Sequence, residues 1–410
     1  MTILIERLGH RGDGIAAGPV YAARTLPGET VDGERDGDRI LSPKIVQPSP
    51  DRVAAPCQHY RSCGGCALMH ASDSFVAGWK TDMVHAALTA QGVTAPVGEI
   101  STSPSGTRRR AAFTGRRLKS GPVVGFHARA SDTVVPVPGC KVLDPTLVDV
   151  LPALREITAR FGSRKGALRF LATASQAGVD VAIGGGTTPD GEGRLALAAL
   201  ANASDLARVS YDGDVIVERR PPVQRFDAVS AVPPPGAFLQ ATPQGEAALR
   251  DAVRDAVGSA SQVADLFAGC GTFALPLALG ADVHAVEGDA DMLLELDRAW
   301  RHGAGLKRVT TETRDLFRRP LEPDELNRYD AVVIDPPRAG AEAQMRALGA
   351  STVDRIAAVS CNPISFARDA RILTRAGYRL TSLQIVDQFR WSAHIELVAA
   401  FRRDHMARGK

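Results

Sequence analysis

The chain has 410 residues, of which 44% are hydrophobic and 23% are charged, and its formal net charge is +3. This length exceeds one ordinary core and predicts two or three domains, and the composition excludes a globally disordered chain. No apolar run reaches the roughly 18 residues that cross a bilayer, and charged residues interrupt the N-terminal segment where a signal peptide would be apolar. We therefore expect a globular cytoplasmic protein that does not bind a membrane.

The first two regions of the chain are rich in predicted strands. Residues 1–52 contain short β segments separated by glycine and proline turns, which predicts a small barrel. A helix is predicted at 74–92, where apolar residues recur at helical spacing. From about 100 to 235, strands with glycine turns fit an antiparallel sheet within an α+β domain. We predict domains at 1–52, 53–235 and 236–410, with the 74–92 helix packed on either the second or the third.

Beyond the proline-rich segment 231–238, strands and helices alternate. Helices are expected at 243–258, from 272 onward and around 290–302, and strands at 263–267, 283–287, 331–335 and 356–360. Such alternation is typical of a doubly wound α/β domain, in which ligands bind at the carboxyl ends of the parallel strands.

A glycine loop follows the first strand of this third region. The segment from Asp265 to Phe273 reads DLFAGCGTF, and Gly269 and Gly271 would let the backbone approach a ligand at a helix N-terminus. Glu287 ends the next strand, where an acidic side chain accepts hydrogen bonds from a ribose. The alternatives are a plain strand-to-helix turn or a dinucleotide site, but the third glycine of a dehydrogenase fingerprint is absent at Ala274. The order of motifs is that of Rossmann-like methyltransferases.

Candidate catalytic residues follow the later strands. Asp335 opens the motif DPPR, and Cys361 lies in SCNP after the next strand, so both are predicted at one edge of the sheet. Arg338 stands where enzymes that methylate amines usually have an aromatic residue, which disfavours that reaction. A cysteine in such a turn can serve as a nucleophile. Alternation places His394 and Glu396 on one face of a late strand.

These motifs together identify a resemblance that spans nearly the whole chain. The sequence resembles the RNA 5-methyluridine methyltransferases, which modify transfer RNA and large-subunit ribosomal RNA. The resemblance depends on CQHYRSCGGC, FLQATPQGE, DLFAGCGTF, VEGD, DPPRAG, VSCNP with FARD, and HIE. It implies a C-terminal class I methyltransferase domain of the Rossmann-like type that uses S-adenosylmethionine.

The resemblance also implies roles for individual residues. The thiolate of Cys361 would add to carbon 6 of a uracil ring and so activate carbon 5, and Glu396 would remove the carbon-5 proton. Asp335 would position the base or the methyl donor. Gln240, Phe267, Glu287 and Asp315 match the family's cofactor contacts, whereas Thr272 stands where some relatives have asparagine.

The expected partner is RNA. Residues 1–52 resemble the OB-like barrel called the TRAM domain, which binds RNA in this family. Ribosomal (23S) RNA is favoured over tRNA, and the protein is expected to be a monomer. The densest basic cluster is predicted either to contact phosphates or to be a solvated face; its members are Arg108, Arg109, Arg110, Arg116, Arg117 and Lys119.

Four cysteines form a further candidate site. Cys57, Cys63 and Cys66 have the spacing C-x5-C-x2-C, and Cys140 stands alone downstream. Four thiolates suit a [4Fe-4S] cluster or a tetrahedral zinc ion, and zinc ribbons usually pair two close knuckles. The cluster is therefore preferred over zinc and over free thiols, and the family resemblance supports it. Its role would be structural or RNA-orienting because the methylation involves no electron transfer.

Two other functions remain as alternatives. An iron–sulfur oxidoreductase could use the glycine loop for a dinucleotide, but it would leave SCNP without a purpose. An inactive RNA-binding or assembly factor would be indicated by loss of Cys361 or Glu396, and both residues are present.

Overall fold

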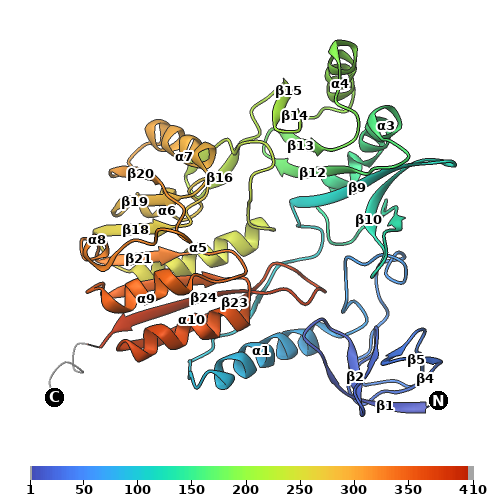
Figure 1. Ribbon diagram of the computed structural model, residues 1–410, viewed down its shortest axis with the longest axis horizontal. Coiled ribbons are helices and arrows are strands. Elements are labelled where there is room, and N and C mark those ends of the chain that lie inside the picture. Colours follow the sequence, from blue (N-terminus) through green and yellow to red (C-terminus); the bar gives the residue numbers. More distant parts are fainter. Residues whose placement is uncertain (1, 405–410) are drawn as a thin grey trace.

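The computed structural model describes residues 2–404, which form three sheets of seven or eight strands and one hairpin (Figure 1). The first sheet is small and curled, and it lies at the N-terminal end of the molecule (Figure 1). Its strand order is β5-β6-β3-β2-β1-β4-β7. Ile5, Val20 and Val31 fill its small core. The strands are β1 (Thr2–Leu8), β2 (Gly14–Ala16), β3 (Val20–Ala22), β4 (Thr30–Asp32), β5 (Arg35–Asp36), β6 (Arg39–Ile40) and β7 (Lys44–Gln47).

The second sheet carries helices on its margin, with α3 and α4 seen above and beside it in Figure 1. Its order is β11-β10-β9-β12-β13-β14-β15, and all its pairs are antiparallel except β13 with β14. The expected antiparallel sheet is thus interrupted once, because α4 returns the chain in the same direction. The elements are β9 (Arg110–Leu118), β10 (Gly121–His127), β11 (Val134–Val135), α2 (Pro145–Asp149), α3 (Leu151–Phe161), β12 (Leu168–Ser175), β13 (Gly178–Gly184), α4 (Gly191–Ala203), β14 (Arg208–Tyr211) and β15 (Asp214–Glu218).

The third sheet is the eight-stranded, doubly wound sheet with the order β20-β19-β18-β21-β22-β24-β23-β8. The hairpin β16 (Gln224–Phe226) and β17 (Val229–Ala231) precedes it. Its elements in chain order are α5 (Pro243–Val257), β18 (Gln262–Leu266), α6 (Ala274–Leu277), β19 (Asp282–Glu287), α7 (Ala290–His302), β20 (Val309–Thr313), α8 (Pro323–Leu326), β21 (Ala331–Ile334), α9 (Glu342–Ala350), β22 (Arg355–Ser360), α10 (Pro363–Arg375), β23 (Tyr378–Asp387) and β24 (Glu396–Arg403). Only β24 runs antiparallel to its neighbours.

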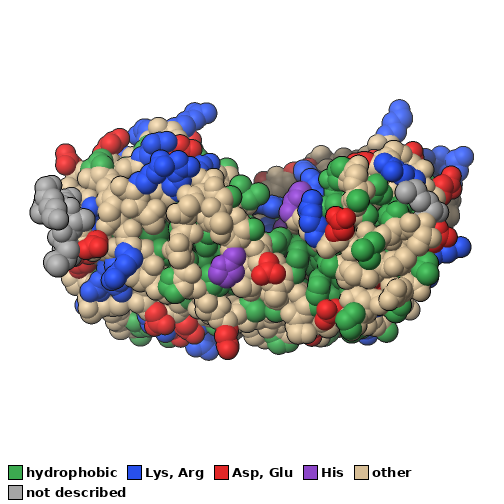
Figure 2. All heavy atoms as spheres, turned by 90° about the horizontal axis from the view of Figure 1, so that it is seen from below, with side chains coloured by type: hydrophobic (Ala, Val, Ile, Leu, Met, Phe, Trp, Pro, Cys, Tyr) green, Lys and Arg blue, Asp and Glu red, His purple; other side chains and the backbone are tan. Residues whose placement is uncertain are grey.

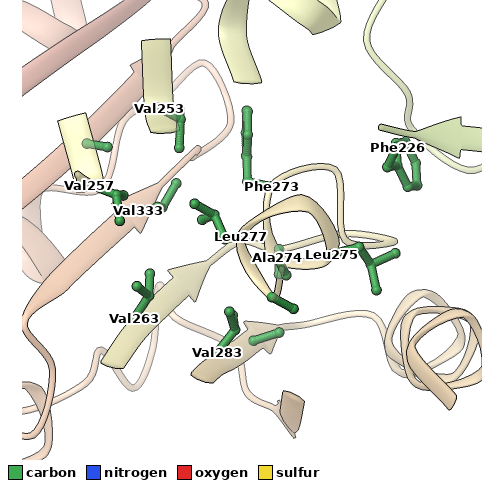
Figure 3. Close-up of a cluster of buried hydrophobic side chains, with 14 of the residues drawn as sticks. Phe226, Val253, Val257, Val263, Phe273, Ala274, Leu275, Leu277, Val283 and Val333 are labelled. Atoms are coloured by element: carbon green, nitrogen blue, oxygen red, sulfur yellow. The ribbon is translucent and has the colours of Figure 1, made fainter. Parts of the chain in front are cut away.

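Alternation along the central strands gives this sheet two apolar faces. Val263 and Val333 point to the face covered by α5 and α7, where Val253 of α5 joins the cluster (Figure 3). Ala264 and Ile334, one position along, belong to the cluster on the opposite face. Because helices cover both faces of these parallel strands, nearly every side chain along them is buried. Their sequences are therefore continuous apolar runs.

An early segment of the chain joins this late sheet. Helix α1 (Asp73–Ala90) packs its Val84 and Leu88 into the same cluster as Phe366 and Leu373 of α10. Strand β8 (Ser101–Thr102) then pairs in parallel with β23. The chain therefore contributes to the doubly wound sheet before it builds the second sheet.

Two local expectations differ from the structure. The helix expected from Thr272 contains only Ala274–Leu277, and the chain turns at Gly280. His394 lies in the loop before β24, because that strand begins at Glu396. No helix among residues 2–404 is long and apolar enough to span a membrane.

Candidate active site

The loop after β18 has the backbone geometry of a ligand-binding turn. Phe267, Gly269 and Gly271 have positive φ angles of 64°, 56° and 93°. A Cβ at Gly271 would lie 2.8 Å from Leu275, whereas nothing lies within 4 Å of a Cβ at Gly269. Packing therefore requires a glycine at position 271, whereas Gly269 leaves the backbone open to a ligand. Backbone strain at a residue such as Phe267 is characteristic of functional sites.

Glu287 at the end of β19 faces this loop. Its Oε2 accepts a 3.0 Å hydrogen bond from the Gly269 amide, and its Oε1 accepts bonds of 2.6 and 3.1 Å from the amides of Gly288 and Asp289. The strand-end carboxylate and the glycine loop thus form one structure, as their motifs predict.

The ring of Phe267 lies next to the turn after β20. Its centroid is 5.4 Å from that of Phe317, an exposed residue. Asp315 is also exposed, and its Oδ1 accepts a 3.0 Å bond from the Phe317 amide. Glu287, Phe267 and Asp315 therefore surround the same strand ends.

The fully buried Asp265 gives a test of which ligand this region fits. Neither of its carboxyl oxygens has a hydrogen-bond partner of ordinary geometry within residues 2–404. Burial, followed by the nearby Asp335, raises its pKa well above the usual value. The Ala274 amide offsets this burial in part. The carboxyl therefore keeps the capacity to face a cationic ligand, and S-adenosylmethionine carries both a sulfonium and an ammonium group.

Three chemically active side chains meet at the ends of β21, β22 and β24. Asp335 follows β21 and Cys361 follows β22, and these two strands are paired in parallel. Strand β24 runs the other way, with Leu397 paired to Ser360. Because Cys361 follows Ser360 and Glu396 precedes Leu397, the thiol and the carboxyl lie at the same end of neighbouring strands.

The SCNP motif has a clear local function. Asn362 caps α10: its Oδ1 accepts a 3.1 Å bond from the Ile364 amide, and Pro363 supplies the first helical residue. The Asn362 Nδ2 also donates to the carbonyl oxygen of Arg338 at 3.0 Å. The turn that carries Cys361 is thereby tied to the DPPR loop.

Burial and mutual repulsion set the protonation of this group. Burial raises the pKa of Asp335 to about 7. Burial, and then the charge of Asp335, raises the pKa of Glu396 well above its usual value. Burial, and then Glu396 and Asp335, raises the pKa of the Cys361 thiol to about 11, while Arg338 lowers it. All three shifts disfavour the charged forms, and the pKa of Asp335 lies near neutral pH.

Two glutamines connect the cofactor side of the site to the strand that carries Glu396. The Nε2 of Gln240 donates to Asp335 at 3.4 Å, and the Nε2 of Gln388 donates to the Oε1 of Gln240 at 2.6 Å. The Oε1 of Gln388 accepts a 2.7 Å bond from the Ala241 amide. Gly245 permits this contact, because a Cβ there would lie 2.6 Å from the Cβ of Gln388.

The basic cluster divides into buried and exposed members. Arg109 is buried, forms an ion pair with Glu246, and donates through Nε to the carbonyl oxygen of Gln240 at 3.1 Å. Of the six, only Arg117 and Lys119 are exposed. Arg109 therefore belongs to the framework behind Gln240, and neither expected role, phosphate contact or a solvated face, applies to it.

The four cysteines of the candidate cluster site line a cavity whose walls do not include Cys361. Cys57, Cys63, Cys66 and Cys140 line one cavity of about 270 Å³, which also borders Ser392 and His394. All four thiols are free. Burial, and then the other three cysteines, raises the pKa of Cys66 to about 12, so the sulfurs lie close enough to interact.

A donor set of four thiols around one cavity fits a [4Fe-4S] cluster. Among residues 2–404, no group of three or more Cys, His, Asp or Glu side chains is arranged to hold a metal ion.

The structure thus brings together Gln240, Asp335, Cys361 and Glu396 at one set of strand ends, beside the glycine loop with Glu287. Sequence reasoning missed Gln388 and Lys80, whose side chains are buried near Glu396. The available signal for Lys80 was its four-residue spacing from Val76 and Val84, which places it on the apolar face of the helix. Nothing local distinguishes Gln388.

A hollow separates two lobes on the face seen in Figure 2, and Lys, Arg and His side chains line part of it.

Residues 305–403 match the family tRNA (Uracil-5-)-methyltransferase. An uncharacterized RNA methyltransferase of Rhizobium meliloti (strain 1021) is 45% identical, over 98% of this chain and 99% of that protein. The 23S rRNA (uracil(1939)-C(5))-methyltransferase RlmD of Chromohalobacter salexigens is 33% identical, over 98% of this chain and 89% of its own length.

The fold has a solved counterpart over its full length. The crystal structure of a Pyrococcus abyssi tRNA (uracil-54, C5)-methyltransferase in complex with S-adenosyl-L-homocysteine superimposes with a TM-score of 0.77 at 23% identity, covering 98% of this chain and 99% of that one. The multidomain α/β architecture is therefore shared. The chain belongs to the RNA uracil-5 methyltransferase family and is an S-adenosylmethionine-dependent RNA (uracil-C5)-methyltransferase.

Proposed function

We propose that the enzyme methylates its uridine through a covalent bond between Cys361 and carbon 6 of the ring. The observation that carries this proposal is the meeting of Cys361 and Glu396 at the end of the paired strands β22 and β24, beside Asp335. A nucleophile and a separate base are the two groups that substitution at carbon 5 requires.

The proposed steps conserve atoms and electrons. The Cys361 thiol loses its proton to solvent, and the thiolate adds to carbon 6, which moves an electron pair toward carbon 5. S-adenosylmethionine, when bound, would supply a methyl group made electrophilic by the positive charge on its sulfur, and the electron pair of the broken S–CH3 bond would stay on that sulfur. After carbon 5 has taken this methyl group, the carboxylate of Glu396 accepts the carbon-5 proton. The C–H electron pair forms the C5=C6 double bond, the C6–S bond breaks, and Cys361 leaves as a thiolate.

The other site residues position these reactants. Glu287 is proposed to contact the ribose, and Gln240, Phe267 and Asp315 the remaining cofactor surface, around the open backbone of Gly269 and the tight turn at Gly271. Asp335 lies where a carboxylate would stabilise the positive charge of the donor, and its partner Gln240 fixes its orientation.

The substrate is proposed to be 23S rRNA rather than tRNA. The 33% identity to an enzyme named for a 23S rRNA uridine supports this choice. The curled sheet of residues 2–47 is proposed to bind RNA as a TRAM-like domain, and the enzyme to act as a cytoplasmic monomer. The target uridine must leave its stack, which costs a few kcal/mol and requires such additional binding surface.

Nucleoside mass spectrometry of separated rRNA and tRNA tests the reaction and the substrate. Deletion of the gene should remove 5-methyluridine from 23S rRNA, wild type should restore it, and Cys361→Ala should not. Loss from tRNA alone would replace the rRNA assignment. Persistence of every 5-methyluridine, together with no methylation of RNA from the deletion strain by purified enzyme, would contradict the proposal.

Cys57, Cys63, Cys66 and Cys140 are proposed to hold a [4Fe-4S] cluster with a structural or RNA-orienting role. Two observations support this proposal: the four cysteines line one cavity, and the other three thiols raise the pKa of Cys66. Anaerobically purified protein should contain about four iron atoms and four sulfides and absorb visible light, and Cys140→Ser should lose both properties. Stoichiometric zinc without visible absorbance would favour the zinc alternative. Bound flavin or nicotinamide would favour the alternative function of an iron–sulfur oxidoreductase.

A further inference from the structure

The loop 388–395, which joins β23 to β24, connects directly to the active site at both ends. Gln388 is its first residue and bonds to Gln240. Glu396 follows its last residue and begins β24. The position of this loop therefore determines where the proposed base lies relative to Cys361.

One buried lysine holds both ends of the loop. Lys80 of α1 has no exposed surface. Its Nζ lies 2.6 Å from Oδ1 of Asp387 and 3.0 Å from the carbonyl oxygen of His394, with the carbonyl oxygen of Phe389 at 3.5 Å. An ammonium has three N–H donors and no acceptor. All three donors of Lys80 therefore point to acceptors at the two ends of this loop.

The loop is also supported on its other side. The carbonyl oxygen of Trp391 accepts bonds of 2.9 and 3.0 Å from the amides of Ala67 and Leu68, just after Cys66. The Trp391 ring packs with Tyr60 and Met69. Ala67 and Leu68 thus hold the middle of the loop at Trp391. Lys80 holds the two ends of the loop.

We propose that Lys80 is a positioning residue for the proton-removal step: by joining Asp387 to the His394 carbonyl, it holds Glu396 against the methylated ring. This inference depends on the proposed function of Glu396. Lys80 does not touch the uracil or the methyl donor. It acts through the backbone two residues before the base, from a helix that lies more than 300 positions earlier in the chain.

The proposal predicts a step-specific defect. Attack by Cys361 and methyl transfer precede proton removal, so a displaced Glu396 would slow only the release of the product. The methylated, covalently bound enzyme–RNA adduct should then accumulate. A variant that is merely less stable would lower every step together, because less protein is folded, and would leave no excess of adduct.

The test uses the full-length enzyme and total rRNA and tRNA from cells lacking the gene. Lys80→Met keeps the length of the side chain and removes its charge and donors. Glu396→Gln serves as the reference for a blocked base. Arg208→Met is the matched control, because it breaks another buried ion pair, with Asp180 at 2.7 Å in the central sheet, away from the loop. Adduct is measured on denaturing gels, and folding by S-adenosyl-L-homocysteine binding.

We expect at least tenfold more adduct for Lys80→Met than for wild type, approaching Glu396→Gln, with no excess for Arg208→Met. A displacement of about 1 Å can cost on the order of a hundredfold in rate, so tenfold is a conservative threshold. If Glu396→Gln accumulates adduct and Lys80→Met, folded and binding cofactor product, does not, the positioning proposal is overturned and the proposed function stands. If Glu396→Gln yields no adduct and turns over normally, the function assigned to Glu396 fails and the inference fails with it.

A second variant covers the case in which Lys80→Met does not fold. Lys80→Met with Asp387→Asn removes both charges, so that no unpaired charge remains buried. The double variant still lacks the connection between Asp387 and His394. It should therefore also show the tenfold excess of adduct, and a folded double variant with wild-type adduct levels would overturn the proposal.

Discussion

The side-chain amide of Gln388 donates a 2.6 Å hydrogen bond to the amide oxygen of Gln240, and this bond joins the loop before Glu396 to the segment beside Asp335. Both side chains are almost fully buried. One polar contact therefore links the loop that carries the proposed base to the cofactor side of the site, between two segments far apart in the sequence.

Replacing Gln388 by leucine should lower both stability and turnover. The Ala241 amide and the Gln240 side chain would each lose a buried partner, which costs about 1–3 kcal/mol. We expect kcat to fall by about tenfold or more, because Gln240 and Glu396 lose their common support. Urea unfolding and steady-state methylation measure the two effects.

The matched control is Gln344→Leu. Gln344 is as deeply buried, and its side chain bonds to the backbone of Leu321 rather than to a residue of the proposed site. It should show a similar loss of stability with an almost unchanged kcat per folded molecule. Equal losses of kcat in the two variants would argue against a specific role for Gln388.

Formation of the covalent adduct should accelerate as the pH rises. The pKa of the Cys361 thiol is raised to about 11, so below that value the thiolate fraction increases about tenfold for each pH unit. RNA that contains 5-fluorouridine traps the adduct, because fluorine cannot leave as a cation. Single-turnover trapping between about pH 7 and 9 should therefore give a slope near one, and a flat profile would contradict thiolate attack.

Arg338 should shift this profile, because its positive charge lowers the pKa of Cys361. Arg338→Met removes that charge, raises the thiol pKa further and slows trapping several-fold at any pH within the range. Arg338→Lys keeps the charge and should preserve most of the rate. The same trapping assay with the three proteins makes the comparison, and identical profiles for Met and Arg would exclude an electrostatic role.

Binding of the methyl donor should release a proton from Asp335. Burial raises its pKa to about 7, so at about pH 6.5 the carboxyl of the free enzyme is largely protonated. A nearby positive charge favours the ionised form. S-adenosylmethionine should therefore bind more tightly as the pH rises from about 6 to 8.

Calorimetry in buffers of different ionisation enthalpy measures the protons released. S-adenosylmethionine should release more than S-adenosyl-L-homocysteine, whose sulfur is neutral, and Asp335→Asn should abolish the difference. Equal release by the two ligands with wild-type enzyme would show that Asp335 does not sense the sulfonium.

The two loop glycines should respond differently to alanine. At Gly269 the new Cβ meets no protein atom, so the variant should lose only the roughly 1–2 kcal/mol of left-handed strain while its affinity for S-adenosyl-L-homocysteine falls about tenfold or more. At Gly271 the Cβ would collide with Leu275 and Leu296, and the main effect should be on stability. Thermal unfolding and calorimetric binding separate the two, and unchanged affinity in Gly269→Ala would argue against a ligand at this backbone.

Local patterns in the sequence determined much of this protein. The strand and helix bounds of the doubly wound region lie within a few residues of those expected, because apolar runs and helical periodicity are properties of the segments themselves. The glycine loop and its neighbour Glu287 were likewise indicated by short motifs, since a backbone turn needs particular residues at particular positions.

Only the tertiary structure decided how distant segments complete the site. His394 was expected in a strand but lies in the loop, because that loop is held by Lys80 and by the backbone after Cys66 rather than by strand pairing. Arg109 was expected in a basic cluster that either contacts phosphates or faces solvent, but it is buried against Glu246 behind Gln240. The sequence alone does not show which group a polar side chain will bond to. Its burial is stable only when packing brings donor and acceptor together, and that depends on the whole fold.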